Sequence, residues 1–252
     1  MRVTTAGTGT VAPHALRVCA GHLVECDDVV LLLDCGSGVV HRLAALGLPW
    51  TRITHIAISH FHADHIADLA MLCYAFRYGQ LPARSAPLQI IGPPGIRDLI
   101  DRMALVFGTW LHAPGYALEI VESTPDRELR LGATLTLSCF PVPHTPESVA
   151  YSVVEGARRV VYSGDTGFSE PLARWAVGCD VFLAECSLPD VLAIPSHCTP
   201  TQVGAMAAMA HPALLALTHF YPPVEAVDIA ALVAEQFSGS VVLATDGWSI
   251  DL

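Results

Sequence analysis

One short segment concentrates side chains of the kinds that bind metal ions. Residues 59–65 read Ser-His-Phe-His-Ala-Asp-His and follow a short apolar stretch. In an extended chain His60 and His62 point the same way, while Asp64 and His65 follow as the chain turns towards a helix. Neutral imidazole and ionised carboxylate suit zinc and its first-row neighbours. We therefore expect two ligand sets to diverge from this one loop.

Three later segments each place one further potential ligand after an apolar strand candidate. His144 follows Phe-Pro-Val-Pro, Asp165 lies in Ser-Gly-Asp-Thr-Gly, and His219 follows Leu-Leu-Ala-Leu-Thr. With H-x-H-x-D-H at residues 60–65, these segments resemble the motifs of the metallo-β-lactamase superfamily. They occur in the family's order and span most of the chain, so the resemblance depends on several motifs together.

The resemblance implies two divalent metal ions, with zinc as the first expectation and manganese or iron as alternatives. It distributes the ligands in two sets: His60, His62 and His144 on one metal, and Asp64, His65 and His219 on the other, with Asp165 bridging. Such a pair, ~3.5 to 4 Å apart, activates water near neutral pH and stabilises attacking and leaving oxygens. Asp64 could also accept or relay the proton of that water.

A second loop resembles the ribonuclease Z and arylsulfatase branch of this family. Residues 196–199 read Ser-His-Cys-Thr, and the resemblance gives His197 the role of proton donor to the leaving group. Glu185, at the end of an apolar segment, matches its acidic partner. A carboxylate beside an imidazole orients the ring and raises its pKa, which suits a general acid.

The elements that must position these residues alternate between apolar strands and helices, which predicts an α/β layer architecture. Strands are expected at Val3–Thr5, His22–Glu25, Val29–Asp34, His55–Ser59, Leu88–Ile91, Ala117–Val121, Ala133–Phe140, Ala150–Glu155, Arg159–Ser163, Val181–Glu185, Leu214–Thr218 and Val241–Thr245. Helices are expected at Val39–Leu46, Ile66–Phe76, Pro94–Phe107, Pro171–Val177, Thr201–Ala210 and Pro223–Phe237. The resemblance implies a four-layer αββα sandwich with metals at one sheet edge.

Length and composition favour a single domain over residues 1–252, with halves meeting near residues 127–132. Apolar runs fall well short of the ~18 residues that span a membrane. Residues 1–5 lack the pattern of a secretory signal, so we expect a cytoplasmic protein. The eight cysteines are scattered in apolar stretches, and buried free thiols are expected. Cys198 adjoins His197 and is a minor candidate for a ligand.

Charge bears on the substrate. The formal net charge is −11 and all 13 basic residues are arginine. Such a field does not favour a long nucleic acid. Residues 151–161 also run almost directly from one strand to the next, where long ribonuclease Z proteins insert an arm that grips tRNA. The Gly-Thr-Gly-Thr segment at residues 7–10, with Pro13 and Arg17, resembles that branch, but Ala15 and Val18 depart from its lysine and asparagine.

These observations predict a binuclear metal-dependent phosphodiesterase acting on small or cyclic diesters. Promiscuous activity on phosphotriesters and sulfate esters is also expected, because these esters present a similar tetrahedral centre to the metals. We expect no membrane partner, and the resemblance leaves a homodimer open. Residues 105–116 are aromatic and glycine-punctuated, and either cover the metals or pack in the core.

The alternatives are tRNA 3′ processing, aryl sulfate or lactone hydrolysis, di-iron redox chemistry and a non-catalytic scaffold. Di-iron relatives usually have glutamate where His62 stands. Scaffold relatives usually lack ligands, and none is missing here.

Overall fold

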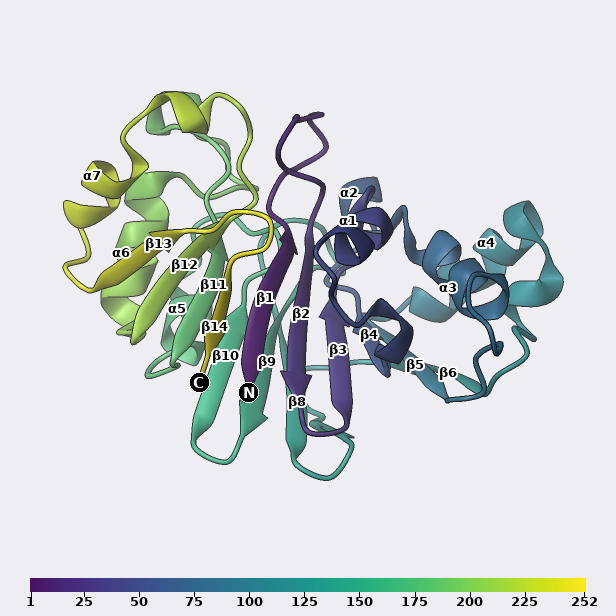
Figure 1. Ribbon diagram of the computed structural model, residues 1–252. Helices are drawn as coiled ribbons and strands as arrows, with labels where there is room; N and C mark the ends of the chain where they lie inside the picture. The colour runs from purple at the N-terminus through teal and green to yellow at the C-terminus, as the bar shows by residue number, and fades with distance from the viewer.

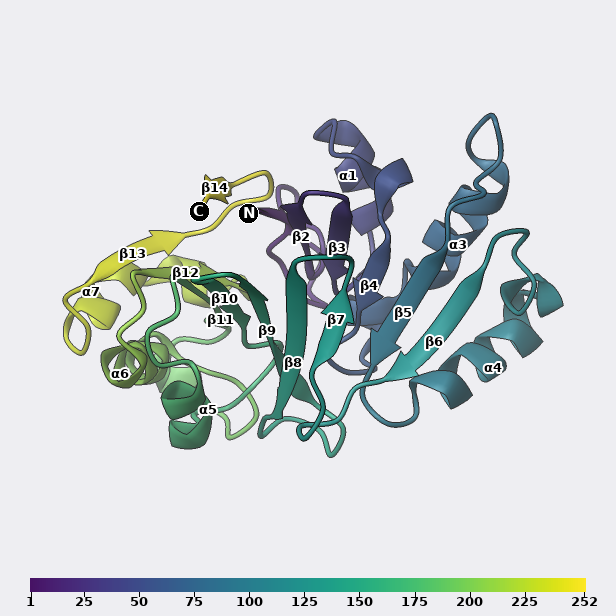
Figure 2. The ribbon, with the colours of Figure 1, turned by 90° about the horizontal axis from the view of Figure 1, so that it is seen from below.

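A computed structural model describes residues 1–252 and contains two seven-stranded sheets packed face to face. Figure 1 shows α5, α6 and α7 outside one sheet and α1 to α4 outside the other. Figure 2, seen from below, shows the same layers with the two sheets between them. The predicted α/β fold with four layers is confirmed.

The two sheets repeat one pairing pattern. The first runs β14 (Ser249–Asp251), β1 (Arg2–Gly7), β2 (Gly21–Cys26), β3 (Val29–Leu33), β4 (His55–Ala57), β5 (Leu88–Gly92) and β6 (Leu118–Glu122). The second runs β7 (Leu129–Leu131), β8 (Leu135–Pro141), β9 (Val149–Glu155), β10 (Arg158–Tyr162), β11 (Val181–Glu185), β12 (Leu214–Thr218) and β13 (Ser240–Leu243). In both, three antiparallel pairings precede three parallel ones. The chain is therefore an internal structural duplication.

The helices and short 3₁₀ turns connect the parallel strands. The helices are α1 (Val39–Ala45), α2 (Ala63–Ile66), α3 (Leu69–Tyr78), α4 (Ile96–Phe107), α5 (Glu170–Trp175), α6 (Pro200–Ala210) and α7 (Ile229–Ala234). The 3₁₀ turns are η1 (Trp50–Arg52), η2 (Thr109–Leu111), η3 (Asp190–Leu192) and η4 (Val224–Ala226). None of these helices is both long and apolar enough to cross a membrane.

Three apolar clusters hold the layers together. Strand β3 shows how: Val30 and Leu32 pack against the helices, while Leu31 and Leu33 pack between the sheets. A strand covered on both faces must be apolar throughout, which explains its unbroken run of Val and Leu. The third cluster lies between the second sheet and α5, α6 and α7. Packing on both faces therefore holds each sheet rigidly, and with it the loops at the ends of its strands.

Two predicted helices are wrong in extent. The helix expected at Ile66–Phe76 is split, because the chain breaks around Asp68, whose carboxylate accepts a hydrogen bond from the backbone N–H of Val40. The helix expected at Pro223–Phe237 is split into η4 and α7, because Asp228 caps a new start by accepting from the N–H of Ala231.

The sequence patterns also missed two strands. Both β7 and β14 are only three residues long and pair antiparallel with β8 and β1, respectively. Three residues are too few to establish a period-2 pattern, so pairing with an existing neighbour is what makes them strands. Strand β14 returns the end of the chain to the first sheet.

Candidate metal centre

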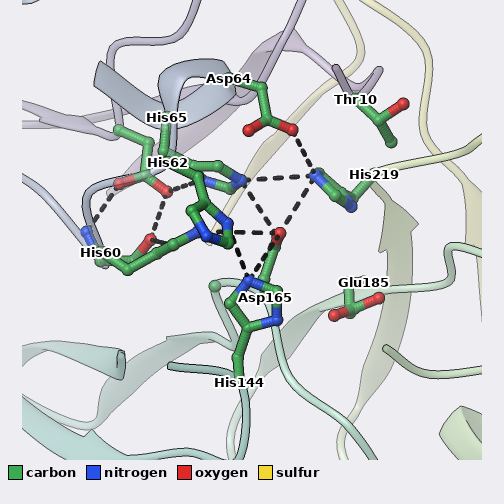
Figure 3. Close-up of polar contacts among 12 residues, drawn as sticks. Thr10, His60, His62, Asp64, His65, His144, Asp165, Glu185 and His219 are labelled. Carbon is green, nitrogen blue, oxygen red and sulfur yellow. Dashed lines mark hydrogen bonds and ion pairs between the residues drawn. The ribbon is translucent and has the colours of Figure 1, made fainter. Parts of the chain in front are cut away.

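The side chains with metal-binding chemistry gather at one end of the two sheets. His60 and His62 follow β4, Asp64 and His65 lie in α2, and the remaining three follow β8, β10 and β12, respectively: His144, Asp165 and His219. Figure 3 shows them gathered about the carboxylate of Asp165. The structure thus brings together all seven residues that the sequence selected as ligands.

The first donor set comprises His60, His62, His144 and Asp165, whose ligand atoms all lie within 4.8 Å of one another. Nε2 of His144 lies 3.0 Å from Nδ1 of His62. Nδ1 of His144 lies 2.8 Å from the carbonyl oxygen of Ser196 and must donate to it. The lone pair on Nε2 of a neutral His144 therefore points into the set.

The second donor set comprises Asp64, His65, Asp165 and His219, again within 4.8 Å. Nε2 of His65 lies 3.1 Å from Oδ1 of Asp165, and Nε2 of His219 lies 3.3 Å from the same oxygen. Oδ2 of Asp64 lies 3.5 Å from Nε2 of His219. All four side chains are buried, whereas His62 in the first set is exposed.

Asp165 links the sets, because its Oδ2 faces the first, 3.8 Å from Nε2 of His60, and its Oδ1 faces the second. Nε2 of His60 and Oδ1 of Asp165 are buried, and neither atom has a hydrogen-bond partner. Buried polar atoms without partners cost free energy unless another group satisfies them. Imidazole and carboxylate are preferred donors for first-row divalent cations. These residues therefore fit a pair of such cations.

The turn that presents Asp165 requires glycine before it. Gly164 has φ +57°, a left-handed conformation that favours glycine. A Cβ there would stand 2.9 Å from Cβ of Ser59 and 3.0 Å from the carbonyl oxygen of Val149. The absence of a side chain lets the Asp165 turn approach the loop that carries His60.

Hydrogen bonds behind the imidazoles orient them. Nδ1 of His65 donates to Oδ2 of Asp34 at 2.7 Å. Nδ1 of His219 lies 2.9 Å from Oγ of Ser187, which in turn donates to Glu185. With Nδ1 engaged, each ring directs Nε2 inward, and such outer partners fix the tautomer of metal-binding histidines.

Asp34 and Ser187 were not among the site residues predicted from the sequence. Asp34 is fully buried and accepts four hydrogen bonds: from the N–H and hydroxyl of Ser59, from His65 and from the hydroxyl of Tyr162. Its φ of +59° is unusual for a non-glycine residue. The available signal was an acidic residue directly after five apolar residues of a buried strand.

His197 and Glu185 form the predicted pair. Nδ1 of His197 lies 3.1 Å from Oε1 and 3.2 Å from Oε2 of Glu185. Burial lowers the pKa of His197, but the hydrogen bond and charge of Glu185 outweigh it and raise the pKa above its ordinary value. Glu185 also accepts from the N–H of Cys198, which fixes the loop. The arrangement supplies a proton donor beside the donor sets.

The pKa shifts of His60 and Asp64 match the protonation states that metal ligands need. Burial, reinforced by the charge of His65, lowers the pKa of His60 to about 3. Burial raises the pKa of Asp64, but the hydrogen bond with His219 and the charges of His65 and His219 outweigh it and lower the pKa to about 2. At neutral pH His60 is therefore neutral and Asp64 ionised, as cation binding requires. For His65 burial lowers the pKa, but the carboxylates of Asp165 and Asp34 outweigh it and raise the pKa well above its ordinary value, so a cation would displace a proton there.

A cavity of about 340 Å³ opens onto both donor sets. It is lined by Val11, His62, Ala63, Asp64, Asp165, His197 and Tyr221. The loop that follows β1 thus contributes to the wall through Val11. Burial, followed by the charges of Asp64 and Asp165, raises the pKa of Tyr221 to about 12, so its phenol is neutral.

Two alternatives were open for the segment 105–116, a cover over the metals or packing in the core, and the structure excludes the cover. None of its residues lines the cavity. Leu111 is buried in the core, and the ring of Trp110 packs at 5.1 Å against Tyr74 of α3. The physical reason is that Tyr74 of α3 provides an aromatic partner for Trp110, near the β6 edge of the first sheet. The loop after β1 takes its place at the site.

Two further residues singled out in the sequence, Arg17 and Cys198, stabilise the surroundings of the site but belong to neither donor set. Arg17 donates to Glu225 at 2.7 Å and to the hydroxyl of Thr8 at 2.6 Å, and so ties the loop after β1 to the loop after β12. Cys198 is buried and its thiol points to the sulfur of Met206 at 3.8 Å. Its thiol therefore lies in the core beneath α6, away from the donor sets.

Known proteins resemble the chain along nearly its whole length. Residues 30–220 match the Beta-lactamase superfamily domain. Ribonuclease Z of Mycobacterium bovis is 28% identical over 98% of this chain and 96% of its own.

Two solved structures extend the comparison. The metallo-β-lactamase fold protein YhfI of Bacillus subtilis has a TM-score of 0.84 at 26% identity, covering 99% of this chain and 98% of its own. The short form of human tRNase Z has a TM-score of 0.80 at 25% identity, covering 100% and 99%. With two donor sets of histidine and aspartate at the sheet ends, the chain belongs to the metallo-β-lactamase superfamily as a metal-dependent hydrolase.

Proposed function

We propose that the protein hydrolyses phosphodiesters at a centre of two divalent cations, with zinc the first choice for both. The observation that carries this proposal is the position of Asp165, with one carboxylate oxygen towards each donor set. His60, His62 and His144 would hold one cation, and Asp64, His65 and His219 the other. Bound there, the cations would supply an activated water and Lewis-acid stabilisation of the phosphoryl oxygens.

The protein's own groups manage protons. In hydrolysis a bond forms from the water oxygen to phosphorus, and the bond from phosphorus to the leaving oxygen breaks. His197, held by Glu185 and lining the cavity, delivers a proton to that leaving oxygen. Asp64 also lines the cavity and can accept the proton of the attacking water.

Several features favour small diesters as substrates. Strands β9 and β10 are joined by two residues, with Arg158 paired to Glu155, which leaves no room for an arm at this turn. No arginine lines the cavity, the chain has no lysine and the net charge is −11. Binding of a long nucleic acid depends on many cationic contacts with its phosphates. Phosphotriesters and sulfate esters present a similar tetrahedral centre.

A second candidate is tRNA 3′ processing. It is favoured by the 28% identity to a protein named ribonuclease Z along nearly the whole chain. Both candidates are phosphodiester hydrolases and share the site chemistry, so the difference between them lies in the bound substrate.

One comparison of substrates separates these candidates. The zinc-loaded protein would be assayed with bis(p-nitrophenyl) phosphate, a cyclic nucleotide, a phosphotriester, an aryl sulfate, a lactone and a precursor tRNA. We expect turnover of the small diesters and weak, salt-sensitive binding of tRNA. Accurate 3′ cleavage of the precursor at nanomolar enzyme, matching turnover of the small diesters, would replace the first candidate with the second. Turnover confined to sulfate esters or lactones would refute both.

A further inference from the structure

The cavity offers few groups that can donate a hydrogen bond to a substrate. Val11 and Ala63 are apolar, and ionised Asp64 and Asp165 only accept. His62 belongs to a donor set. Besides His197, the one remaining side chain in the lining is that of Tyr221. The non-bridging oxygens of a bound phosphoryl group accept hydrogen bonds, and the hydroxyl of Tyr221 is a donor that lines the same cavity.

The ring of Tyr221 is fixed against the site. Its centroid lies 5.9 Å from that of His197 and 6.0 Å from that of His219, at interplanar angles of 72° and 82°. Its backbone N–H donates to the carbonyl of Ser187 at 3.2 Å, and its own carbonyl accepts from Val224 at 3.0 Å. The ring of Tyr221 therefore meets both imidazoles in an edge-to-face arrangement. Hydrogen bonds to its backbone N–H and carbonyl hold the residue in this position.

The hydroxyl of Tyr221 has no partner within the protein, although the residue is half-buried. The buried tyrosines differ: Tyr151 donates to the carbonyl of Ile58 at 2.8 Å, and Tyr162 donates to Asp34 at 2.7 Å. The hydroxyl of Tyr221 is instead open to solvent in the cavity. A phenol with a free O–H at this position is available for a ligand.

We propose that Tyr221 is a substrate-contacting residue whose O–H donates a hydrogen bond to a non-bridging oxygen of the bound phosphoryl group. This inference rests on the proposed hydrolysis of phosphodiesters. On that mechanism His197 serves the leaving oxygen, so the two donors of the cavity have separate tasks. Because the non-bridging oxygens are present with every leaving group, the contribution of Tyr221 does not depend on the leaving group.

The test compares Tyr221→Phe, which keeps the ring and removes only the hydroxyl, with Tyr74→Phe. Tyr74 lies on α3 and packs against Trp110, away from the cavity, so its variant is the matched control. Hydrogen bonds to charged groups contribute enough to predict that Tyr221→Phe lowers kcat/KM by about 10- to 100-fold. The loss should be equal for p-nitrophenyl and alkyl leaving groups, with metal content unchanged.

A binding measurement provides a second readout. Inorganic phosphate should bind the zinc-loaded Tyr221→Phe protein more weakly than the wild type by a similar factor, as measured by calorimetry. Unchanged phosphate affinity and unchanged kcat/KM would overturn the inference and leave Tyr221 as a packing residue. A loss confined to poor leaving groups would also overturn it, because Tyr221 would then act through His197. If the wild type cleaves no phosphodiester, the proposed function fails, while phosphate affinity still tests Tyr221.

Discussion

The two donor sets differ in burial and in what stands behind them. The second set is wholly buried, and carboxylates lie behind its imidazoles: Asp34 directly behind His65, and Glu185 through Ser187 behind His219. The first set has an exposed member, His62, and a backbone carbonyl behind His144. Carboxylate partners raise ligand basicity more than a neutral carbonyl does. We expect the second set to hold its cation more tightly.

The largest effect should come from removing the residue that the sets share. Asp165→Ala deletes the carboxylate that the two sets share and leaves buried ligands without their counter-charge, which typically lowers the free energy of unfolding by about 3–5 kcal/mol. On the proposed mechanism both cations also depend on this carboxylate, so we expect activity to fall by roughly 10²- to 10⁴-fold. Metal analysis should show the content falling from about two ions per chain. An active Asp165→Ala protein with unchanged metal content would remove the basis for a shared centre.

Single ligand deletions in each set sharpen the comparison directly. His62→Ala should leave the buried second set intact and retain about one ion per chain after dialysis against a weak chelator. His219→Ala should retain less metal under the same dialysis, because only the more exposed first set remains. Inductively coupled plasma mass spectrometry measures both. The reverse order of retention would show that burial and outer carboxylates do not govern affinity here.

Substitution of His197 tests whether the proton donor can be removed without loss of metal from either donor set. His197→Ala should keep both ions and the fold, and slow esters of high-pKa leaving groups by ~10² or more. p-Nitrophenyl esters should slow much less, since that leaving group hardly needs a proton. Glu185→Gln should give a milder version of the same pattern. Equal losses for every leaving group would assign His197 a positioning role, and loss of an ion would make it a ligand.

The smallest of these effects should come from the carboxylate behind His65. Asp34→Asn keeps the shape but weakens the partner of Nδ1, and outer-partner changes typically lower metal affinity about 10- to 100-fold. Tyr162→Phe is the matched control, because it removes one hydrogen bond to the same carboxylate and leaves His65 paired. Zinc titration with a competing chelator should show weakening at one of two sites. Equal weakening at both sites would contradict the separation of the sets.

The sequence located much of this arrangement because several signals are local. His60, His62, Asp64 and His65 occupy six consecutive positions, so their proximity follows from chain connectivity alone. Strands β11 and β12 were predicted with the observed bounds, since their apolar runs are buried on both faces. The split at Asp68 was missed because its carboxylate accepts from Val40, which lies far from it in the sequence. The split at Asp228 was missed because its side-chain cap competes with an apolar pattern that continues through it.

The sequence by itself determined which residues have metal-binding chemistry and the α/β class, because residue types and apolar periodicity are properties of the chain. Only the tertiary structure decided that Asp165 turns one oxygen to each donor set, that Asp34 lies behind His65, and that Tyr221 lines the cavity. Only it showed that Trp110, within residues 105–116, packs against Tyr74 of α3. These relations join residues far apart in the chain, and packing of two sheets fixes them where no local pattern can.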